Sequence, residues 1–352
     1  MGRPSLILAA LAADAAPGKS FRTYRRIDSN PELDQLHLWD QDDHAYQLLI
    51  PATASGEAEL AGELQAIEVI TKLAQQLEIE VPEIMGQTKD SDGTSAVLLS
   101  LIGGENPDLA RFAPGEFSKS LASTLAQIHQ LNPEFVRDAG LPEYSADEIL
   151  RTKVAEIDQI AQTGRVPAEL LTRWEQATED LGLFRFHPTV IHGSISDDTL
   201  RVSGQSVTGI TSWSSLQIGD PAEDLRWVTG GALRTTLEDT LIHYRALREQ
   251  ADENIAQRAQ LYSELELGSW LAYCLKQKDE KAIAQAEDMV SELRDQLEAG
   301  NLRSLRSASF AGISSPVEAP RTEAMVAIDA TETAEIAQVA QDQDATRDEE
   351  LF

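Results

Sequence analysis

The first hundred residues switch between strand-like and helix-like patterns of apolar and polar side chains. Short stretches alternate between the two kinds of residue and are bounded by polar turns such as QDD and KDSDG, which is typical of paired strands. Four strands are predicted, over residues 33–40, 44–51, 81–87 and 95–102. Between the second and the third, residues 57–77 repeat apolar side chains at helical spacing. The pattern predicts a small α+β lobe over residues 21–103.

From residue 104 to residue 303 the helical period dominates. Five helices are predicted, over residues 117–131, 146–162, 167–180, 237–249 and 254–276. A segment of different character interrupts them at residues 189–227, where short apolar runs flank a turn at Gly204 and predict short strands. The sequence therefore predicts a second, mainly helical lobe with a small β-rich insert.

Both ends of the chain differ from the two lobes. Residues 1–20 place one basic residue, Arg3, ahead of a short Ala- and Leu-rich run, which has some likeness to a secretion signal. Pro17 and Gly18 are typical helix-stop residues, so we favour a helix that packs on the first lobe. Residues 304–352 are rich in Ala, Glu, Asp, Thr and Ser and poor in aromatics, which is the composition of a disordered acidic tail.

The net charge, the length of the apolar runs and the cysteine count limit which partners and which cell compartment the protein can have. The net charge of −30 disfavours binding to nucleic acid or to anionic membrane surfaces. No apolar run approaches the roughly 20 residues that a membrane span needs. Cys274 is the only cysteine, which excludes an intrachain disulfide and fits a reducing cytoplasm.

The strongest chemical signal is one block, residues 190–227, which reads VIHGSISDDTLRVSGQSVTGITSWSSLQIGDPAEDLRW. It resembles the aminoglycoside and macrolide phosphotransferases. Their pattern is a His-Gly-Asp loop, an Asn five residues after that Asp, an Asp before Trp or Phe, and then Gly-Asp-Pro-x-x-Asp-Leu. The resemblance runs from residue 6 to about residue 302 and leaves out only the tail. It implies a two-lobed, protein-kinase-like α+β fold with a small-molecule ligand between the lobes, and Mg·ATP as cofactor if the protein is active.

The resemblance also assigns roles to positions. In the family, the loop Asp accepts the substrate's hydroxyl proton, the Asn and the second Asp hold Mg²⁺, and a Lys or Arg on a strand pairs with a helix Glu and holds the nucleotide phosphates. The corresponding positions here are Ser194 (loop Asp), Thr199 (metal Asn), Ser212 (metal Asp), Leu49 (strand cation) and Glu63 (helix Glu). The residues that match the family are the loop residues His192 and Gly193 and the structural acids Asp220 and Asp224.

The replaced side chains are those that carry the chemistry, whereas the retained ones shape the loop. A serine hydroxyl is not a base near neutral pH, and it is a poor Mg²⁺ ligand beside a carboxylate. We therefore predict a pseudo-phosphotransferase whose cleft keeps a binding or regulatory role. One alternative is an active enzyme that uses displaced carboxylates, with Asp197, Asp198 and Asp220 as candidates. Another is a scaffold that binds a protein partner through the acidic tail.

Overall fold

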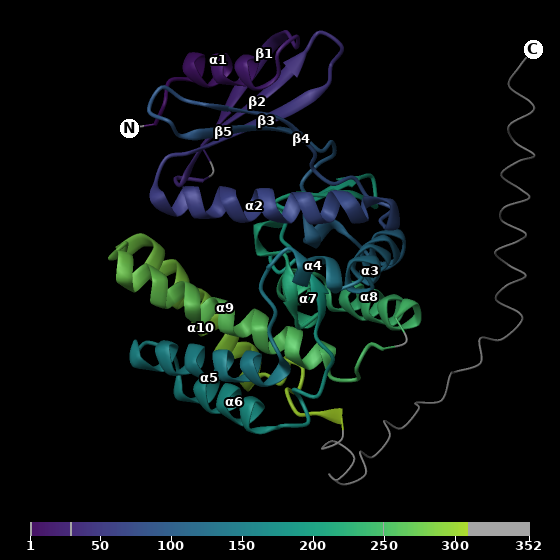
Figure 1. Ribbon diagram of the computed structural model, residues 1–352. Coiled ribbons are helices and arrows are strands. Elements are labelled where there is room, and N and C mark those ends of the chain that lie inside the picture. The colour runs from purple at the N-terminus through teal and green to yellow at the C-terminus, as the bar shows by residue number, and fades with distance from the viewer. Residues whose placement is uncertain (1, 29, 249, 309–352) are drawn as a thin grey trace, which may run out of the picture. The chain divides into compact units, whose positions relative to one another are not determined.

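Five antiparallel strands form the sheet of the first lobe in the computed structural model, which describes residues 2–28, 30–248 and 250–308 (Figure 1). Their spatial order is β1-β2-β3-β5-β4. They are β1 (Phe21–Ile27), β2 (Leu33–Asp40), β3 (Ala45–Pro51), β4 (Ile84–Lys89) and β5 (Ser95–Ser100). The last four overlap the predicted strands. β1 is an edge strand whose mostly exposed, Arg-rich sequence gives no clear alternation.

A different helix covers each face of this sheet (Figure 1). The helices are α1 (Ser5–Ala15) and α2 (Ala54–Leu73), the latter followed by the short turn η1 (Ala74–Gln76). Leu36 and Leu48 belong to the core on the α1 side, whereas Leu49 and Val97 belong to the core on the α2 side. Because successive strand residues point to opposite faces, the adjacent Leu48 and Leu49 enter different cores.

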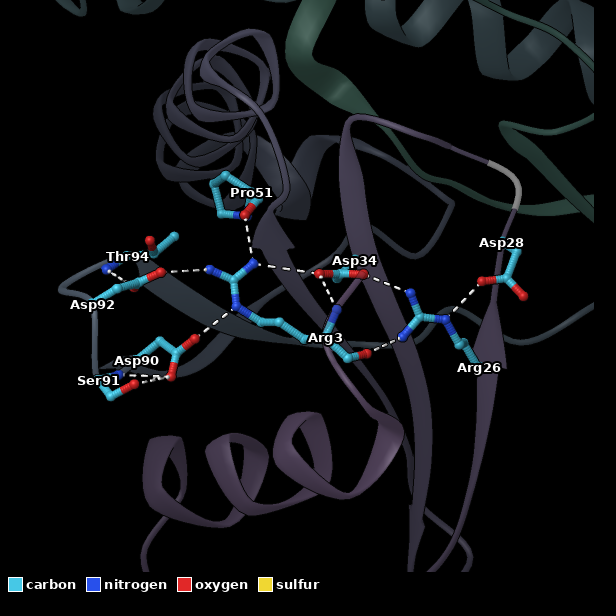
Figure 2. A network of polar contacts seen from close by, with 9 residues as sticks. All are labelled: Arg3, Arg26, Asp28, Asp34, Pro51, Asp90, Ser91, Asp92 and Thr94. Carbon is cyan, nitrogen blue, oxygen red and sulfur yellow. Dashed lines mark hydrogen bonds and ion pairs between the residues drawn. The ribbon is translucent and has the colours of Figure 1, made fainter. Parts of the chain in front are cut away.

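Ionic contacts around Arg3 fix the segment before α1 to the sheet (Figure 2). The Arg3 guanidinium donates to Asp90 in the β4–β5 turn at 2.6 Å, to Asp34 of β2 at 3.3 Å and to the Pro51 carbonyl at 2.9 Å. Asp34, which is 3% exposed, also accepts a hydrogen bond from Arg26 of β1 at 2.5 Å. The network joins the first residues to three strands and a turn, so α1 is built into the lobe.

Helices make up most of the second lobe. They are α3 (Glu116–His129), α4 (Glu134–Asp138), α5 (Ala146–Gln162), α6 (Ala168–Glu179), α7 (Ala222–Gly231), α8 (Arg234–Leu247), α9 (Ile255–Gln277) and α10 (Glu280–Glu298), with the short turns η2 (Leu109–Arg111) and η3 (Trp213–Ser215). The insert consists of two antiparallel pairs: β6 (Thr189–Ile191) with β9 (Gln217–Gly219), and β7 (Leu200–Ser203) with β8 (Ser206–Ile210). One core holds the lobe together around buried Trp174, Trp213, Tyr244 and Tyr262.

Helix α10 has no counterpart among the predicted elements. The Asp279 side chain caps its first turn by accepting from the N–H groups of Lys281 and Ala282. Its buried face consists of Ile283, Ala286, Val290 and Leu293, and polar or charged residues fill most of the intervening positions. These positions have the i, i+3, i+7 spacing of an amphipathic helix, so the sequence contained the signal and the prediction missed it.

Residues 304–308, which the sequence assigns to the tail, pack on the second lobe. The N–H of Ser307 donates to Asp180 at 2.8 Å, and that of Ala308 donates to Asn254 at 2.8 Å. Residues 309–352, the rest of the predicted acidic tail with its predicted partner-binding role, lie outside the described residues. Within the described residues, no helix has both the length and the apolar run needed to cross a bilayer.

Candidate functional site

A cavity of about 550 Å³ lies between the sheet and the β insert. One wall comes from β1, β2, β3, β5 and α2, and the other from the β7–β8 hairpin and the turn after it. The predicted site residues that line it are Leu49, Glu63, Asp198 and Ser212. A second cavity, of about 590 Å³, lies between α6 and residues 304–306 and contains none of the predicted site residues.

The loop after β6 has a fixed shape. The N–H groups of His192 and Gly193 donate to the Asp224 carboxylate of α7 at 2.8 and 2.7 Å. His192 is fully buried, which lowers its pKa, and its Nε2 lies 3.1 Å from the Thr211 carbonyl. Gly193 has φ of +83°, and a Cβ there would lie 2.5 Å from the Ser215 carbonyl oxygen. Only glycine fits this position without strain.

Asp224 is held in turn by a buried chain of hydrogen bonds. His129 of α3 contacts it through Nε2 at 3.1 Å, and the His129 Nδ1 lies 2.7 Å from the Tyr244 hydroxyl. Burial alone would raise the pKa of Asp224, but the contacts with His129 and the N–H of Gly193 outweigh it, so the pKa is lowered. Asp224 is therefore an ionised anchor for the loop, with its oxygens turned to the protein interior.

Asp220 is also committed to the interior. It is 2% exposed and accepts from Arg258 Nε at 2.6 Å and Nη2 at 3.0 Å, and from the Tyr262 hydroxyl at 2.7 Å. The N–H of Ala222 donates to its second oxygen at 2.9 Å. Both carboxylate oxygens are occupied, so Asp220 is not available as a displaced metal ligand.

Three hydroxyl residues stand at the positions that the resemblance assigns to the catalytic and metal-binding side chains, and two of them make local side-chain contacts. Thr199 Oγ1 accepts from the N–H of Ser196 at 2.9 Å, and Thr199 is 7% exposed. The Ser194 Oγ lies 3.4 Å from His192 Nδ1. Ser212 has a left-handed backbone with φ of 62° and lines the cavity just before η3. Thr199 thus braces the loop from within, and no carboxylate stands at any of these three positions.

Leu49 and Glu63, the positions that the resemblance assigns to an ion pair, both line the cavity. Leu49 is 6% exposed and joins the apolar core under α2 with Leu60 and Ile67. Glu63 is 7% exposed, and the N–H groups of Trp213 and Ser214 donate to it. Burial raises the pKa of Glu63 to about 7, because those two hydrogen bonds only partly offset the loss of solvation. Glu63 is thus held by backbone donors, and no ion pair involves it among the described residues.

The two loop acids proposed as substitutes have different positions. Asp198 lines the cavity, and Asn106 donates to it at 3.3 Å. Asp197 is exposed and is not among the described residues that line the cavity. In the described part of the chain, the one group of three His, Cys, Asp or Glu side chains close enough to share a metal is Asp40, Asp42 and His44 at the β2–β3 turn. The donor set of the cleft does not fit the Mg²⁺ site of the family.

Sequence reasoning missed the basic side chains of the cleft. Arg25, His37 and Arg201 line the same cavity as Asp198. Arg25 lies directly opposite His37 in the β1–β2 register, so both share the cleft face of the sheet. Burial and the charges of Arg25 and Arg201 lower the pKa of His37 to about 4. Arg25 and His37 lie on neighbouring strands and Arg201 comes from the insert far along the chain, so no local pattern indicated that the three meet in one cavity.

Comparisons place this geometry among known proteins. The sequence profile of the phosphotransferase enzyme family (APH) matches residues 14–266. The apoenzyme structure of macrolide 2'-phosphotransferase MphH from Brachybacterium faecium is 19% identical in sequence and has a TM-score of 0.67. The match covers 81% of this chain and 97% of the MphH chain. Macrolide 2'-phosphotransferase type I is 18% identical and has a TM-score of 0.66, and the match covers 81% of this chain and 96% of that one.

A third solved structure is a complex with a nucleotide and an antibiotic. The GDP and kanamycin complex of APH(2")-IIIa is 17% identical with a TM-score of 0.66, and the match covers 82% of this chain and 98% of that one. A search among curated proteins finds no match. These likenesses confirm the expected two-lobed, kinase-like fold with an antiparallel N-terminal sheet and a helical second part. Since the family profile spans most of the chain, the protein belongs to the phosphotransferase enzyme family.

Proposed function

We propose that this protein is a ligand-binding member of its family that has lost efficient phosphoryl transfer. The observation that carries the proposal is the chemistry of the cleft. Ser194 and Ser212 stand where the family pattern has its catalytic and metal-binding carboxylates, and Leu49 stands where it has a cation. The single buried Cys274 favours a reducing cytoplasm as its compartment.

Rate arguments support this proposal. Loss of a positioned general base costs about 10²–10⁴ in rate. Loss of metal ligands removes the charge neutralisation on which phosphoryl transfer depends. Meanwhile Asp220 and Asp224 hold the loop and the second lobe together through buried contacts. A scaffold kept without its reactive groups favours binding over catalysis.

The alternative of an active enzyme now depends on Asp198. It is the one acid of the loop over residues 192–199 that lines the cavity, whereas Asp197 does not and Asp220 is paired with Arg258. Mg²⁺ can bind through one carboxylate when substrate phosphates and water complete its shell. The two functions therefore differ in one measurable respect, which is whether nucleotide binding depends on Mg²⁺ and on Asp198.

Thermal unfolding with nucleotide separates the two functions. We expect no Mg²⁺-dependent rise in Tm when ATP or GTP is added, because Thr199 and Ser212 stand at the metal positions of the family pattern and Asp198 is the one acid of the loop that lines the cavity. A ligand present at 100 times its Kd would stabilise the native state by about 2.7 kcal/mol. The measurement compares Mg·ATP and Mg·GTP with each nucleotide in EDTA and with Mg²⁺ alone.

The variant Asp198→Asn serves as the matched control. If the wild-type Tm rises only when Mg²⁺ and nucleotide are both present, and the rise disappears in Asp198→Asn, the displaced-carboxylate enzyme is correct and the present proposal is wrong. Equal melting curves for the two proteins under every condition support the proposal.

A further inference from the structure

The two arginines of the cleft form no ion pair with the acids of the chain. Arg201, on β7, donates through Nη1 to the carbonyl oxygens of Asp198 and Leu200, both at 2.8 Å. Within the described residues, no carboxylate oxygen lies within 4 Å of the Arg201 or Arg25 guanidinium. This is unusual in a chain with 59 acidic and 29 basic residues. Asp198 acts on Arg201 only through its charge at longer range. Neither arginine of the cavity is held in an ion pair, so both can bind an anion that comes from outside the chain.

His37 supplies a second, independent indication. Its Nδ1 is buried and has no hydrogen-bond partner. An orphaned buried nitrogen is costly, because the group loses its hydrogen bonds to water without replacement. The strand register places His37 between Arg25 on β1 and Gln47 on β3, and all three line the cavity. A ligand oxygen there would accept hydrogen bonds from His37 and from the arginines together.

The acids of the cleft are engaged elsewhere. Asp198 accepts from Asn106, and Glu59 accepts from Asn30 at 2.9 Å. Glu63 accepts from the backbone of the turn after β8, and its raised pKa leaves it partly uncharged at neutral pH. Apolar side chains, among them Leu33, Leu99 and Leu101, complete the lining. The cavity thus combines a basic end with an apolar wall, within the usual size of a small-molecule site.

We infer that the cleft binds, without a metal ion, a small molecule that carries a phosphate or carboxylate oxyanion, held by Arg201, Arg25 and His37. The inference rests on the proposed function and deepens it by naming the ligand's chemical class. Because the overall charge of −30 repels anions, such binding requires a local site of this kind.

Calorimetric titration of protein that has been stripped of metal with EDTA and then dialysed into EDTA-free buffer, at constant ionic strength, tests the inference with two probes: inorganic pyrophosphate for the phosphate class and citrate for the carboxylate class. We expect at least one probe to bind, and its affinity to fall about tenfold or more in Arg201→Gln, since a charge-assisted hydrogen bond is lost. Arg25→Gln, on the exposed edge strand, should weaken binding as well and keeps the test available if Arg201→Gln does not fold. The probe that binds identifies the class.

Arg22→Gln is the matched control. Arg22 lies on the same strand as Arg25 but pairs with Asp43 and does not line the cavity. The Arg22→Gln protein should therefore bind each probe with the affinity of the wild type. Absence of binding by both probes at millimolar concentration, or equal affinities for Arg201→Gln and Arg22→Gln, would overturn the inference. The test contains no Mg²⁺ and no nucleotide, so its failure is distinct from a failure of the proposed function.

Discussion

Replacement of Asp220 by alanine is expected to lower the free energy of unfolding by about 3–5 kcal/mol, because it leaves a buried charge without its main partner. Arg258 is fully buried and donates to Asp220 through two nitrogens, at 2.6 and 3.0 Å. Asp252, the other acid that Arg258 contacts, lies nearer the surface, with 17% of its side chain exposed. The loss of Asp220 also removes the acceptor of the Tyr262 hydroxyl. Urea unfolding followed by tryptophan fluorescence measures the change.

Asp197→Ala is the control for this prediction. Asp197 is an exposed acid in the loop over residues 192–199, and no ion pair involves it among the described residues. Its replacement should change stability by no more than about 0.5 kcal/mol. If Asp220→Ala and Asp197→Ala proved equally mild, Asp220 would not be the structural anchor described above, and its carboxylate would again be a candidate for chemistry.

The second large effect concerns Glu63 and depends on pH. Its pKa is about 7 in the folded protein and 4.5 as a free side chain, because burial disfavours the charged form. Below pH 4.5 the carboxyl group is neutral in both the folded and the unfolded protein, so folding does not bury a charge at this position. Above pH 7 the folded protein must bury a carboxylate, which costs up to about 3 kcal/mol at 1.4 kcal/mol per tenfold change in proton affinity.

Glu63→Gln should therefore raise the stability most at pH 8, and the gain should fall steadily as the pH is lowered to 5. Glutamine can still accept a hydrogen bond from the N–H of Trp213 or Ser214, so the local contact survives in part. Glu68→Gln, at an exposed position of the same helix, should show no such pH dependence. A gain for Glu63→Gln that is equal at pH 5 and pH 8 would show that Glu63 is charged throughout this range.

The sequence was informative where a local pattern specifies a structure. Alternation located β2 through β5, and the block over residues 190–227 located the loop and its anchors Asp220 and Asp224. It could not show what those anchors contact, because Arg258 and His129 lie on other helices and approach only in the folded chain. The distinction between Asp197 and Asp198 likewise depends on the direction of each side chain in the loop, which no spacing rule gives.

The basic end of the cleft was invisible for a related reason. Arg25 and Arg201 belong to different lobes, and each is an ordinary arginine in its local sequence. Leu49 is a further example. Its position suggested the loss of a cation, but only the structure shows that the leucine joins the core beneath α2 and that Glu63 turns to the backbone after β8.

Phosphoryl transfer itself is the most direct test of the central claim. Release of γ-phosphate from Mg·ATP and Mg·GTP, and its transfer to a macrolide and to an aminoglycoside, would be measured beside an active macrolide 2'-phosphotransferase. With no base at Ser194 and no metal carboxylate at Ser212, we expect turnover to be lower by about 10⁴-fold or more. A turnover within about 10²-fold of the active enzyme would contradict the claim, because the loss of the base alone should cost at least that much.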